Sequence, residues 1–348
     1  MSDYYLVGDV GGTKTDLAVY SSKDDTRKYV TKQRFQTADY PSLENLIATF
    51  LENNQLIIKE GILSVAGPVL NDRVTFSSSN LPWEVERFKL INELNIPEIS
   101  LINDLEAVAI SIPFLKEDDL YTINQGIKEE NKTLAIIAPG TGLGEAFLLW
   151  TGEKYQPCVS EGAHVNFGPR TETEMGLLRH CRKINRHVTY ESLCSGLGIP
   201  SIYDYLKENS GLEEPSWISD LLKSADDKTP IILDAALQKE RSCTIAQEAL
   251  KLFVSILGAE TGNLVLKTMA TGGIYLGGGL PGKIIPFLDS EIFIEPYADK
   301  GIMAEMMLDV PIHIIINPDS AILGAADYLF HKNGELSSQS GLANPIGS

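Results

Sequence analysis

The stretch VGDVGGTKTD, residues 7–16, comes close to the phosphate-binding loop of the P-loop NTPases, whose pattern is Gly-x-x-x-x-Gly-Lys-Thr. Counted from Gly8, the spacing to the Lys-Thr pair is correct, but Thr13 stands where the second Gly of that pattern belongs. A P-loop also needs a helix directly after the glycines, with its N-terminal amides aimed at the phosphates. Residues 16–20, DLAVY, instead have the apolar content of a strand. The sequence therefore predicts a β-hairpin with a Gly-rich tip.

Two further stretches are built in a similar way. Residues 133–150, TLAIIAPGTGLGEAFLLW, read as an apolar strand, a Gly-rich turn and a returning strand. Residues 272–283, GGIYLGGGLPGK, read as a strand that meets a third Gly-rich turn. A lone Gly-rich hairpin is most often only a tight turn that needs a positive φ angle. Three such turns indicate backbone N–H groups that can converge on phosphate oxygens, and the two similar hairpins predict two related halves.

The remaining pattern is that of an α/β protein. We expect helices over 41–53, 84–94 and 319–330, strands over 61–65, 99–102 and 310–317, and a predominantly helical region between 171 and 269. The end of the chain, SSQSGLANPIGS, is small and uncharged, so the tail over 336–348 is predicted to be disordered.

Composition and charge narrow the class of protein. The chain has 348 residues, enough for two domains of ordinary size, and a formal net charge of −18. Such an acidic chain repels nucleic acid and anionic membranes, but Mg²⁺ and backbone N–H groups still allow a small phosphorylated ligand. No stretch approaches the ~20 apolar residues of a membrane span, and the start MSDYYLVGD lacks the basic region of a signal peptide. We expect a cytoplasmic protein whose four cysteines, without CxxC spacing, are reduced thiols.

Polar side chains stand at the ends of two predicted strands. Asp9 is near the end of the first apolar strand, where an ionised carboxylate is costly without a cation or hydrogen-bond donors beside it. It either caps the hairpin amides or helps to bind Mg²⁺, which prefers carboxylate and water ligands near phosphates. In LINDLEA, residues 101–107, Asn103 and Asp104 stand where a strand gives way to a helix. Taken alone, this pair favours an N-cap; the alternative is a carboxylate that accepts a substrate proton.

A second polar group lies in two Gly-containing segments. SEGAHVNFGP, residues 160–169, brings Glu161 and His164 close together without any amphipathic pattern, which is typical of a functional loop. A lone His is usually a satisfied structural residue, but this one comes with a carboxylate. YESLCSGLG, residues 190–198, adds Glu191. This residue is either a further member of the polar group or a glutamate in the first turn of a helix, where the helix dipole favours a negative charge.

Together these segments resemble the bacterial glucokinase family. The matching stretches are GDVGGTKTDLAVY, SSSNLPW, LINDLEAVA, APGTGLGEAFL, SEGAHVNFGP, YESLCSGLG and GGIYLGGGLPGK, in the family's order and spacing. In SSSNLPW, Ser79 replaces the usual Thr of the family's Thr-Asn-x-x-Trp segment. The resemblance implies an α/β fold, the two-domain actin-like ATPase (ribonuclease H-like) fold with a cleft between a small and a large domain. We expect the small domain at 1–105 plus 317–335, and the large domain, with a helical insertion, at 106–316.

The resemblance also implies roles for single residues. Asp104 matches the catalytic base, which lies at the sugar. The residues that match sugar ligands are Asn80, Asn103, Glu161, His164 and Glu191. The residues that match ATP ligands are Asp9, Gly11, Gly12, Thr13 and Lys14 in the first phosphate motif, Gly140, Thr141 and Gly142 in the second, and Gly277, Gly278 and Gly279 in the adenosine motif. Asp9 is expected to hold Mg²⁺ through water.

The activity implied by the resemblance is ATP-dependent phosphorylation of glucose at its 6-hydroxyl by a cytoplasmic homodimer, with Mg²⁺ and without nucleic-acid or membrane partners. A kinase for mannose, fructose or an N-acetyl hexosamine is the alternative, since sugar epimers differ by one hydroxyl orientation. A non-catalytic sugar-responsive regulator would need a DNA- or partner-binding extension, and a chaperone-like ATPase gives no reason for the sugar ligands. The related ROK sugar kinases carry a Cys-rich zinc motif after the equivalent of His164. This chain has a single Cys there, so no zinc is expected.

Overall fold

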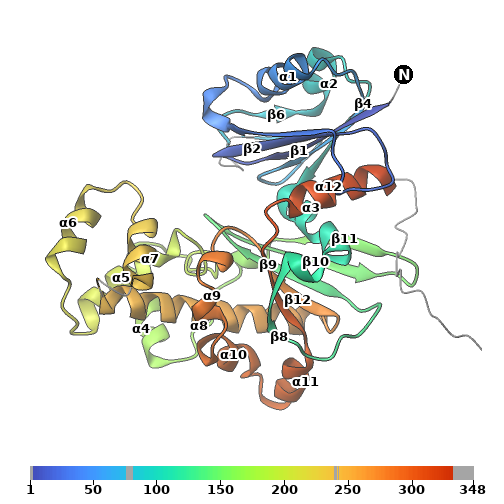
Figure 1. Cartoon of the computed structure of the whole chain (residues 1–348). Coiled ribbons are helices and arrows are strands. Elements are labelled where there is room, and N and C mark those ends of the chain that lie inside the picture. The colour runs from blue at the N-terminus through green and yellow to red at the C-terminus, as the bar shows by residue number, and fades with distance from the viewer. Residues whose placement is uncertain (1–2, 76–80, 239–240, 242, 332–348) are drawn as a thin grey trace, which may run out of the picture. The chain divides into compact units, whose positions relative to one another are not determined.

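The computed structural model of the chain describes residues 3–75, 81–238, 241 and 243–331 (Figure 1). The chain divides into two compact units. Unit 1 consists of Met1–Pro113, Trp150–Gln156 and Asp319–Ser348, and unit 2 of Phe114–Leu149 and Pro157–Pro318. Each unit contains a β-sheet and its own apolar core. The predicted tail over 336–348 and the predicted sugar ligand Asn80 lie outside the described residues.

A five-stranded sheet forms the centre of unit 1. Its strand order is β3 (Thr31–Gln36), β2 (Lys14–Tyr20), β1 (Tyr4–Val10), β4 (Ile58–Val65) and β7 (Ile99–Asn103). β1 and β2 pair antiparallel with Asp9 opposite Asp16, so the first Gly-rich stretch joins the strands of a hairpin, as predicted. β4 pairs parallel with β1, and β7 pairs parallel with β4. Because strand β2 follows the glycines directly, the stretch is not a P-loop.

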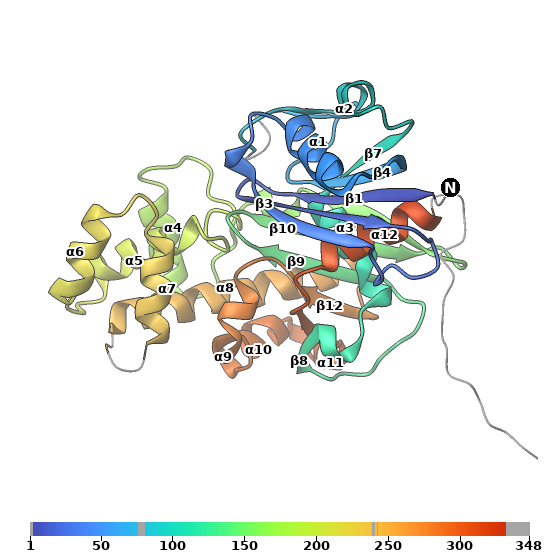
Figure 2. The same ribbon diagram turned by 45° about the horizontal axis from the view of Figure 1, so that its top comes forward.

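Helices cover both faces of this sheet (Figures 1 and 2). They are α1 (Leu43–Asn54) and α2 (Arg87–Leu94) on one face, and α3 (Asp104–Ser111) and α12 (Ser320–His331) on the other. Leu6 of β1 packs in the core under α1 and α2, whereas Val7 packs in the core under α3 and α12. Since successive side chains point to opposite faces, a strand covered on both faces is apolar throughout. Unit 1 is therefore a three-layer α/β/α unit.

Helix α12 packs closely on α3. Any β-carbon at Gly324 would clash with the carbonyl oxygen of Ala107, so a glycine at this position lets the two helix backbones approach each other. Lys32 of β3 forms an ion pair with Asp319, just before α12. Because α3 and α12 pack together, unit 1 extends to Pro113, whereas the sequence-based division ends the small domain at residue 105. The helix that begins at Asp104 therefore lies in unit 1.

The six-stranded sheet of unit 2 has a similar order of strands. The order is β11 (Tyr155–Ser160), β10 (Leu143–Trp150), β9 (Leu134–Pro139), β12 (Gly273–Leu276), β13 (Ile312–Ile315) and β8 (Leu120–Asn124). β9 and β10 form the second predicted antiparallel hairpin, and β12 and β13 continue parallel to β9. β8 adds an antiparallel edge strand. Without β8, both sheets consist of a hairpin flanked by one further strand on one side and two parallel strands on the other, which agrees with two related halves.

One long helix organises the helical region of unit 2. Helix α8 (Thr244–Thr268) packs against β9 and against helices α5, α7, α9 and α10. The remaining helices are α4 (Glu172–Cys181), α5 (Gly198–Asn209), α6 (Ser216–Ser224), α7 (Thr229–Leu237), α9 (Ile285–Leu288), α10 (Glu291–Ala298) and α11 (Ala304–Asp309). Figures 1 and 2 show α4 to α7 gathered at the N-terminal end of α8. No stretch of the sequence was expected to span a membrane, but among the described residues α8 alone is long and apolar enough to cross one. Because 72% of its apolar window is buried, it has the character of a core helix.

One predicted helix begins later than expected. The pattern predicted a helix over 84–94, but Val85–Glu86 forms a short strand, β6, and α2 begins at Arg87. β6 pairs antiparallel with β5 (Arg73–Val74), and an ion pair of 2.8 Å joins Arg73 to Glu86 within this ladder. Pairing with a distant segment therefore overrides the helical pattern at its first residues.

Candidate active site

Hydrogen bonds fix the shape of the first Gly-rich tip, residues 11–13. Gly11 N donates to Lys14 O over 3.0 Å, which closes the turn. Thr37 braces the tip, because its backbone N donates to Thr13 O over 3.0 Å and its hydroxyl donates to Gly11 O over 2.8 Å. Thr13 and Lys14 are exposed, whereas the strands on either side are mostly buried. The tip is a braced, solvent-facing turn, as a phosphate-binding backbone turn requires.

Asp9 and Asp104 lie at the same edge of the unit 1 sheet. β1, β4 and β7 run parallel, so their carboxyl ends meet there. Asp9 Oδ1 accepts a hydrogen bond of 3.1 Å from Ser64 Oγ of β4. Burial and the Asp104 carboxylate raise the pKa of Asp9 to about 6, because desolvation and a like charge both disfavour its ionised form. A buried carboxylate whose ionised form is disfavoured by a second carboxylate nearby is a suitable environment for a cation.

Asn103, not Asp104, caps helix α3. Asn103 Oδ1 accepts hydrogen bonds from the backbone N of Leu105 at 2.9 Å and of Glu106 at 3.2 Å. Asn103 Nδ2 donates to Gly67 O at 3.0 Å, which fixes the cap to the loop after β4. The N-cap that the sequence favoured for this pair is therefore confirmed for Asn103 and leaves Asp104 to another role.

Asp104 is the first residue of the helix, and one of its two carboxylate oxygens is held. Asp104 Oδ1 accepts from Leu105 N at 2.9 Å and from Asn103 Nδ2 at 3.0 Å. Within the described part of the chain, no hydrogen bond from another residue reaches Asp104 Oδ2. Burial raises the pKa of Asp104, which makes its carboxylate a better proton acceptor than an exposed aspartate. The geometry suits a general base with a fixed side chain and a free oxygen.

In unit 2, three predicted sugar ligands form one chain of contacts. His164 Nε2 lies 3.5 Å from Glu161 Oε2, and His164 Nδ1 lies 3.6 Å from Glu191 Oε1. Glu191 N donates to Ala163 O over 3.0 Å, which joins the two segments. The side chains of Glu161 and His164 are 77% and 54% exposed, so their polar atoms are open to a ligand. The structure thus brings together residues from two separate motifs.

Glu191 also contacts the second Gly-rich turn. Glu191 Oε2 accepts a hydrogen bond of 3.1 Å from Leu143 N, directly after the turn. A β-carbon at Gly142 would lie 2.7 Å from the same oxygen, so any side chain there would displace the carboxylate. Gly140 N donates to Gly142 O over 2.8 Å and closes the turn. A predicted sugar ligand and a predicted phosphate turn are therefore in direct contact.

The third Gly-rich turn packs against the strand that leads into the second. Gly277 N donates to Ile137 O over 2.9 Å, and Leu280 N donates to Pro139 O over 3.2 Å. Gly278 has a φ angle of +81°, and a β-carbon at this position would lie 2.7 Å from Pro139 O. Both the backbone conformation and the close approach require glycine. The second and third turns, both predicted ATP ligands, form one continuous surface of backbone.

The turn SGLG, residues 195–198, completes the surroundings of the second Gly-rich turn. Gly196 N donates to Gly140 O over 2.8 Å, and Thr229 Oγ1 donates to Gly196 O over 2.6 Å. From the sequence, Gly196 was no more than part of a loop after Glu191. The repeated glycines of SGLG were the signal in the sequence that could have indicated this contact, since a close approach between two backbones favours glycine.

Metal-binding side chains are sparse. Over the described ranges, no group of three or more His, Cys, Asp or Glu side chains could hold a metal ion. All four cysteines are free thiols, and Cys181, Cys194 and Cys243 are buried. A divalent cation at the first turn would therefore take one or two ligands from the carboxylates of Asp9 and Asp104, and the rest from phosphate and water.

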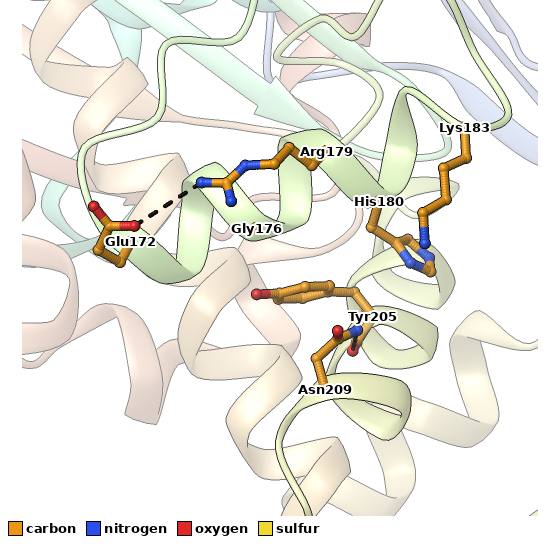
Figure 3. A pocket seen from close by; sticks show the side chains of 7 residues that line it. All are labelled: Glu172, Gly176, Arg179, His180, Lys183, Tyr205 and Asn209. Carbon is orange, nitrogen blue, oxygen red and sulfur yellow. Dashed lines mark hydrogen bonds and ion pairs between the residues drawn. The ribbon is translucent and has the colours of Figure 1, made fainter.

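A separate pocket of about 360 Å³ lies between α4 and α5 (Figure 3). Its lining residues are Glu172, Gly176, Arg179, His180, Lys183, Tyr205 and Asn209. Tyr205 extends beneath Gly176, where a β-carbon would clash with the phenol oxygen. Glu172 and Arg179 lie 3.9 Å apart at the pocket's rim. None of the predicted sugar or ATP ligands lines this pocket.

Comparisons with known proteins identify the family of this chain. The protein-family model described as glucokinase matches residues 6–332. The glucokinase of Trichormus variabilis is 34% identical over 336 residues, which cover 92% of this chain and 97% of the relative. The glucokinase of Cronobacter sakazakii is 32% identical and covers 97% of this chain and 100% of its own length.

Solved structures share the fold. The glucokinase from an Antarctic psychrotroph has a TM-score of 0.78 at 27% identity and covers 95% of this chain and 100% of its own. A ROK family glucokinase from Streptomyces griseus, solved in complex with glucose and AMPPNP, has a TM-score of 0.62 at 17% identity and covers 93% of this chain and 98% of its own. From the family model and the curated relatives together, this chain belongs to the glucokinase family.

Proposed function

We propose that this chain catalyses the ATP-dependent phosphorylation of glucose at the 6-hydroxyl, giving glucose 6-phosphate and ADP. The observation that carries this proposal is the contact of Glu191 with both His164 and the second Gly-rich turn. It joins side chains suited to a sugar with a turn suited to a phosphate. Membership of the glucokinase family gives the same activity.

Glu161, His164 and Glu191 are proposed to bind the sugar hydroxyls. Each hydroxyl can donate one hydrogen bond and accept two, and the carboxylates accept while an imidazole offers one donor and one acceptor when neutral. Glu191 is already held by Leu143 N, so its remaining oxygen faces His164 in a fixed direction. Asn103 is a proposed sugar ligand as well, although its amide already serves as the cap of α3.

The three Gly-rich turns are proposed to bind ATP. The exposed tip with Thr13 and Lys14 and the turn with Gly140 and Gly142 would offer backbone N–H groups and a cation to the phosphates. The turn at Gly278 is proposed for the adenosine. Asp9 would hold Mg²⁺ through water, and that ion would neutralise phosphate charge during transfer.

Asp104 is proposed as the general base. Phosphoryl transfer needs little covalent work from the protein, so the main tasks are positioning and charge stabilisation. Asn103 Nδ2 and Leu105 N fix Asp104 Oδ1, which leaves Oδ2 to accept the proton of the attacking 6-hydroxyl. The raised pKa of Asp104 favours this transfer.

We further propose that the two units are the small and large domains of an actin-like ATPase, outside the ROK group. The shared strand order of their sheets supports this assignment. A homodimer and a cytoplasmic location remain predictions from the family resemblance.

A substrate panel tests the proposed function. Purified protein is incubated with ATP, with and without Mg²⁺, and with glucose, mannose, fructose or N-acetylglucosamine, while ADP release is followed. We expect the highest kcat/KM with glucose and turnover only with Mg²⁺. A higher kcat/KM with another hexose would reassign the substrate, and no sugar-dependent ADP release at all would contradict the kinase activity.

A further inference from the structure

Glu145 is a buried carboxyl group in a strand that is otherwise mostly apolar. It lies on β10, three residues after Gly142, and only 2% of it is exposed. Glu260 of α8, fully buried at 0% exposure, lies close enough for a hydrogen bond between the two carboxyl groups. Two adjacent carboxylates in a buried site cannot both ionise without a large cost, so such a pair retains a proton.

The partners of the two residues indicate which one carries the proton. Glu260 accepts hydrogen bonds from Lys267 Nζ at 2.9 Å and from Asn263 Nδ2 at 2.8 Å, so each of its carboxylate oxygens already has a donor. Glu145 Oε1 is buried and accepts no hydrogen bond from the described residues. Burial and the neighbouring Glu260 raise the pKa of Glu145 to about 7. Glu145 is therefore the member that carries the proton below neutral pH and loses it as pH rises through about 7.

Both segments that carry predicted sugar ligands rest on this pair. The carboxyl group of Glu145 lies directly against Gly162, where a β-carbon would clash with Oε2. Gly162 stands between Glu161 and His164 in the loop 160–164. On the other side, Asn263 Nδ2, which donates to Glu260, also lies 3.1 Å from the hydroxyl of Tyr190, next to Glu191.

We propose that Glu145 and Glu260 share one proton and act as positioning residues that hold Glu161, His164 and Glu191 in their binding geometry. When Glu145 ionises, two buried negative charges lie close together, with Lys267 bound to Glu260, and the repulsion displaces the Glu145 carboxylate toward Gly162. The loop 160–164 then loses its support. Glucose affinity therefore falls as pH rises through neutrality, whereas binding of ATP does not change with this group. The effect on glucose rests on the proposed function; the shared proton does not.

Other titratable groups surround the pair and must be considered in any pH profile. They are Lys267 of α8, Tyr190 and Cys194 in the segment after α4, Glu174 of α4, Lys300 after α10 and, beyond Lys300, Arg170. Burial raises the pKa values of Tyr190 and Cys194, so both stay protonated near neutrality. Burial lowers the pKa of Lys300. Because these groups remain in a Glu145 variant, a comparison with wild type isolates Glu145.

The test measures KM for glucose and kcat from pH 6 to pH 8 in wild type, Glu145→Gln and Asp327→Asn. If only the protonated form binds well and the pKa is about 7, the wild-type KM rises about tenfold over this range, while kcat changes less. Gln mimics the neutral carboxyl group, so Glu145→Gln keeps a low KM and a flatter profile. Asp327→Asn, which neutralises a buried carboxyl group of unit 1 whose pKa is also raised to about 6, keeps the wild-type profile. Equal KM rises in wild type and Glu145→Gln would overturn the proposal.

A second measurement does not depend on catalysis. Hydrogen–deuterium exchange of wild-type amides 160–166, corrected for the intrinsic pH dependence of exchange, should show lost protection between pH 6 and pH 8. Protection that stays constant would overturn the positioning role even if Glu145→Gln fails to fold. If the wild type phosphorylates no hexose but the loop still loosens with pH, the proposed function fails and the proton-sharing pair stands.

Discussion

Replacing Asp104 by Asn separates catalysis from folding. The substitution keeps a side-chain oxygen that can accept from Leu105 N and Asn103 Nδ2, so the local geometry of Oδ1 is retained. The N-cap of α3 is unaffected because Asn103 provides it. The helix loses one first-turn charge, which costs about 0.3–1 kcal/mol, but the variant also loses the repulsion with Asp9. We expect a free energy of unfolding within about 1 kcal/mol of wild type.

The same substitution should remove the base. An amide cannot take the proton of the 6-hydroxyl, and loss of a general base typically costs about 10²–10⁴ in rate. We predict at least a ~100-fold lower kcat, equivalent to about 2.7 kcal/mol of activation free energy, with retained glucose binding. A coupled ADP assay gives kcat, and calorimetry gives glucose affinity.

Glu106→Gln is the matched control for Asp104→Asn. It neutralises another first-turn carboxylate of α3, whose pKa burial also raises, without touching the proposed base. Its kcat should stay near wild type. Near-wild-type turnover in Asp104→Asn would refute the assignment of Asp104 as the base. An equal loss of kcat in both variants would show that the loss comes from removing a first-turn charge of α3.

Four further predictions follow from the same geometry. Glu161→Gln should weaken glucose binding in calorimetry and leave ATP binding intact; equal loss of both would make the loop structural. Gly278→Ala should destabilise the protein by about 1–3 kcal/mol and weaken ATP binding, because its φ is +81° and Pro139 O is close, whereas Gly282→Ala has open space and should do neither. Burial raises the pKa of Asp327 from its ordinary value of 3.8 to about 6, so the folded protein holds this proton more tightly than the unfolded chain does. The contribution of Asp327 to stability therefore falls as the pH rises from about 3.8 to about 6. The melting temperature of Asp327→Asn should therefore rise relative to wild type over that window, and parallel curves would count against the shift. Turnover should need Mg²⁺ and survive a zinc-selective chelator; stoichiometric zinc in elemental analysis would oppose this.

Local patterns in the sequence were sufficient for the hairpins. An apolar strand on each side of a Gly-rich tip specifies the hairpin that ends in Gly11 and the one that ends in Gly140, because the signal lies within a few neighbouring residues. The N-cap at Asn103 is likewise a local signal. The contact between Glu161 and His164 was expected for the same reason, since they are three residues apart.

Contacts between distant segments were not predictable. The placement of Glu191 against Gly142 and of Gly278 against Pro139 depends on how the unit 2 sheet and its loops pack together. The pairing of Glu145 with Glu260 joins a strand to a helix far along the chain. The sequence around each of these two residues contains no pattern that predicts the contact. The position of α3 in unit 1 depends on Gly324 of α12, and the short strand Val85–Glu86 depends on Arg73–Val74. A hydrophobic pattern does not encode such pairings.

Identification of the product tests the central claim most directly. Glucose is incubated with the enzyme, ATP and Mg²⁺, and the product is analysed by phosphorus–proton correlation NMR, with 6-deoxyglucose as the matched substrate that lacks the accepting hydroxyl. The account predicts that the phosphorus couples to the two protons on carbon 6 of glucose, and that 6-deoxyglucose binds without being phosphorylated. Phosphate on any other oxygen of glucose, or phosphorylation of 6-deoxyglucose, would contradict it.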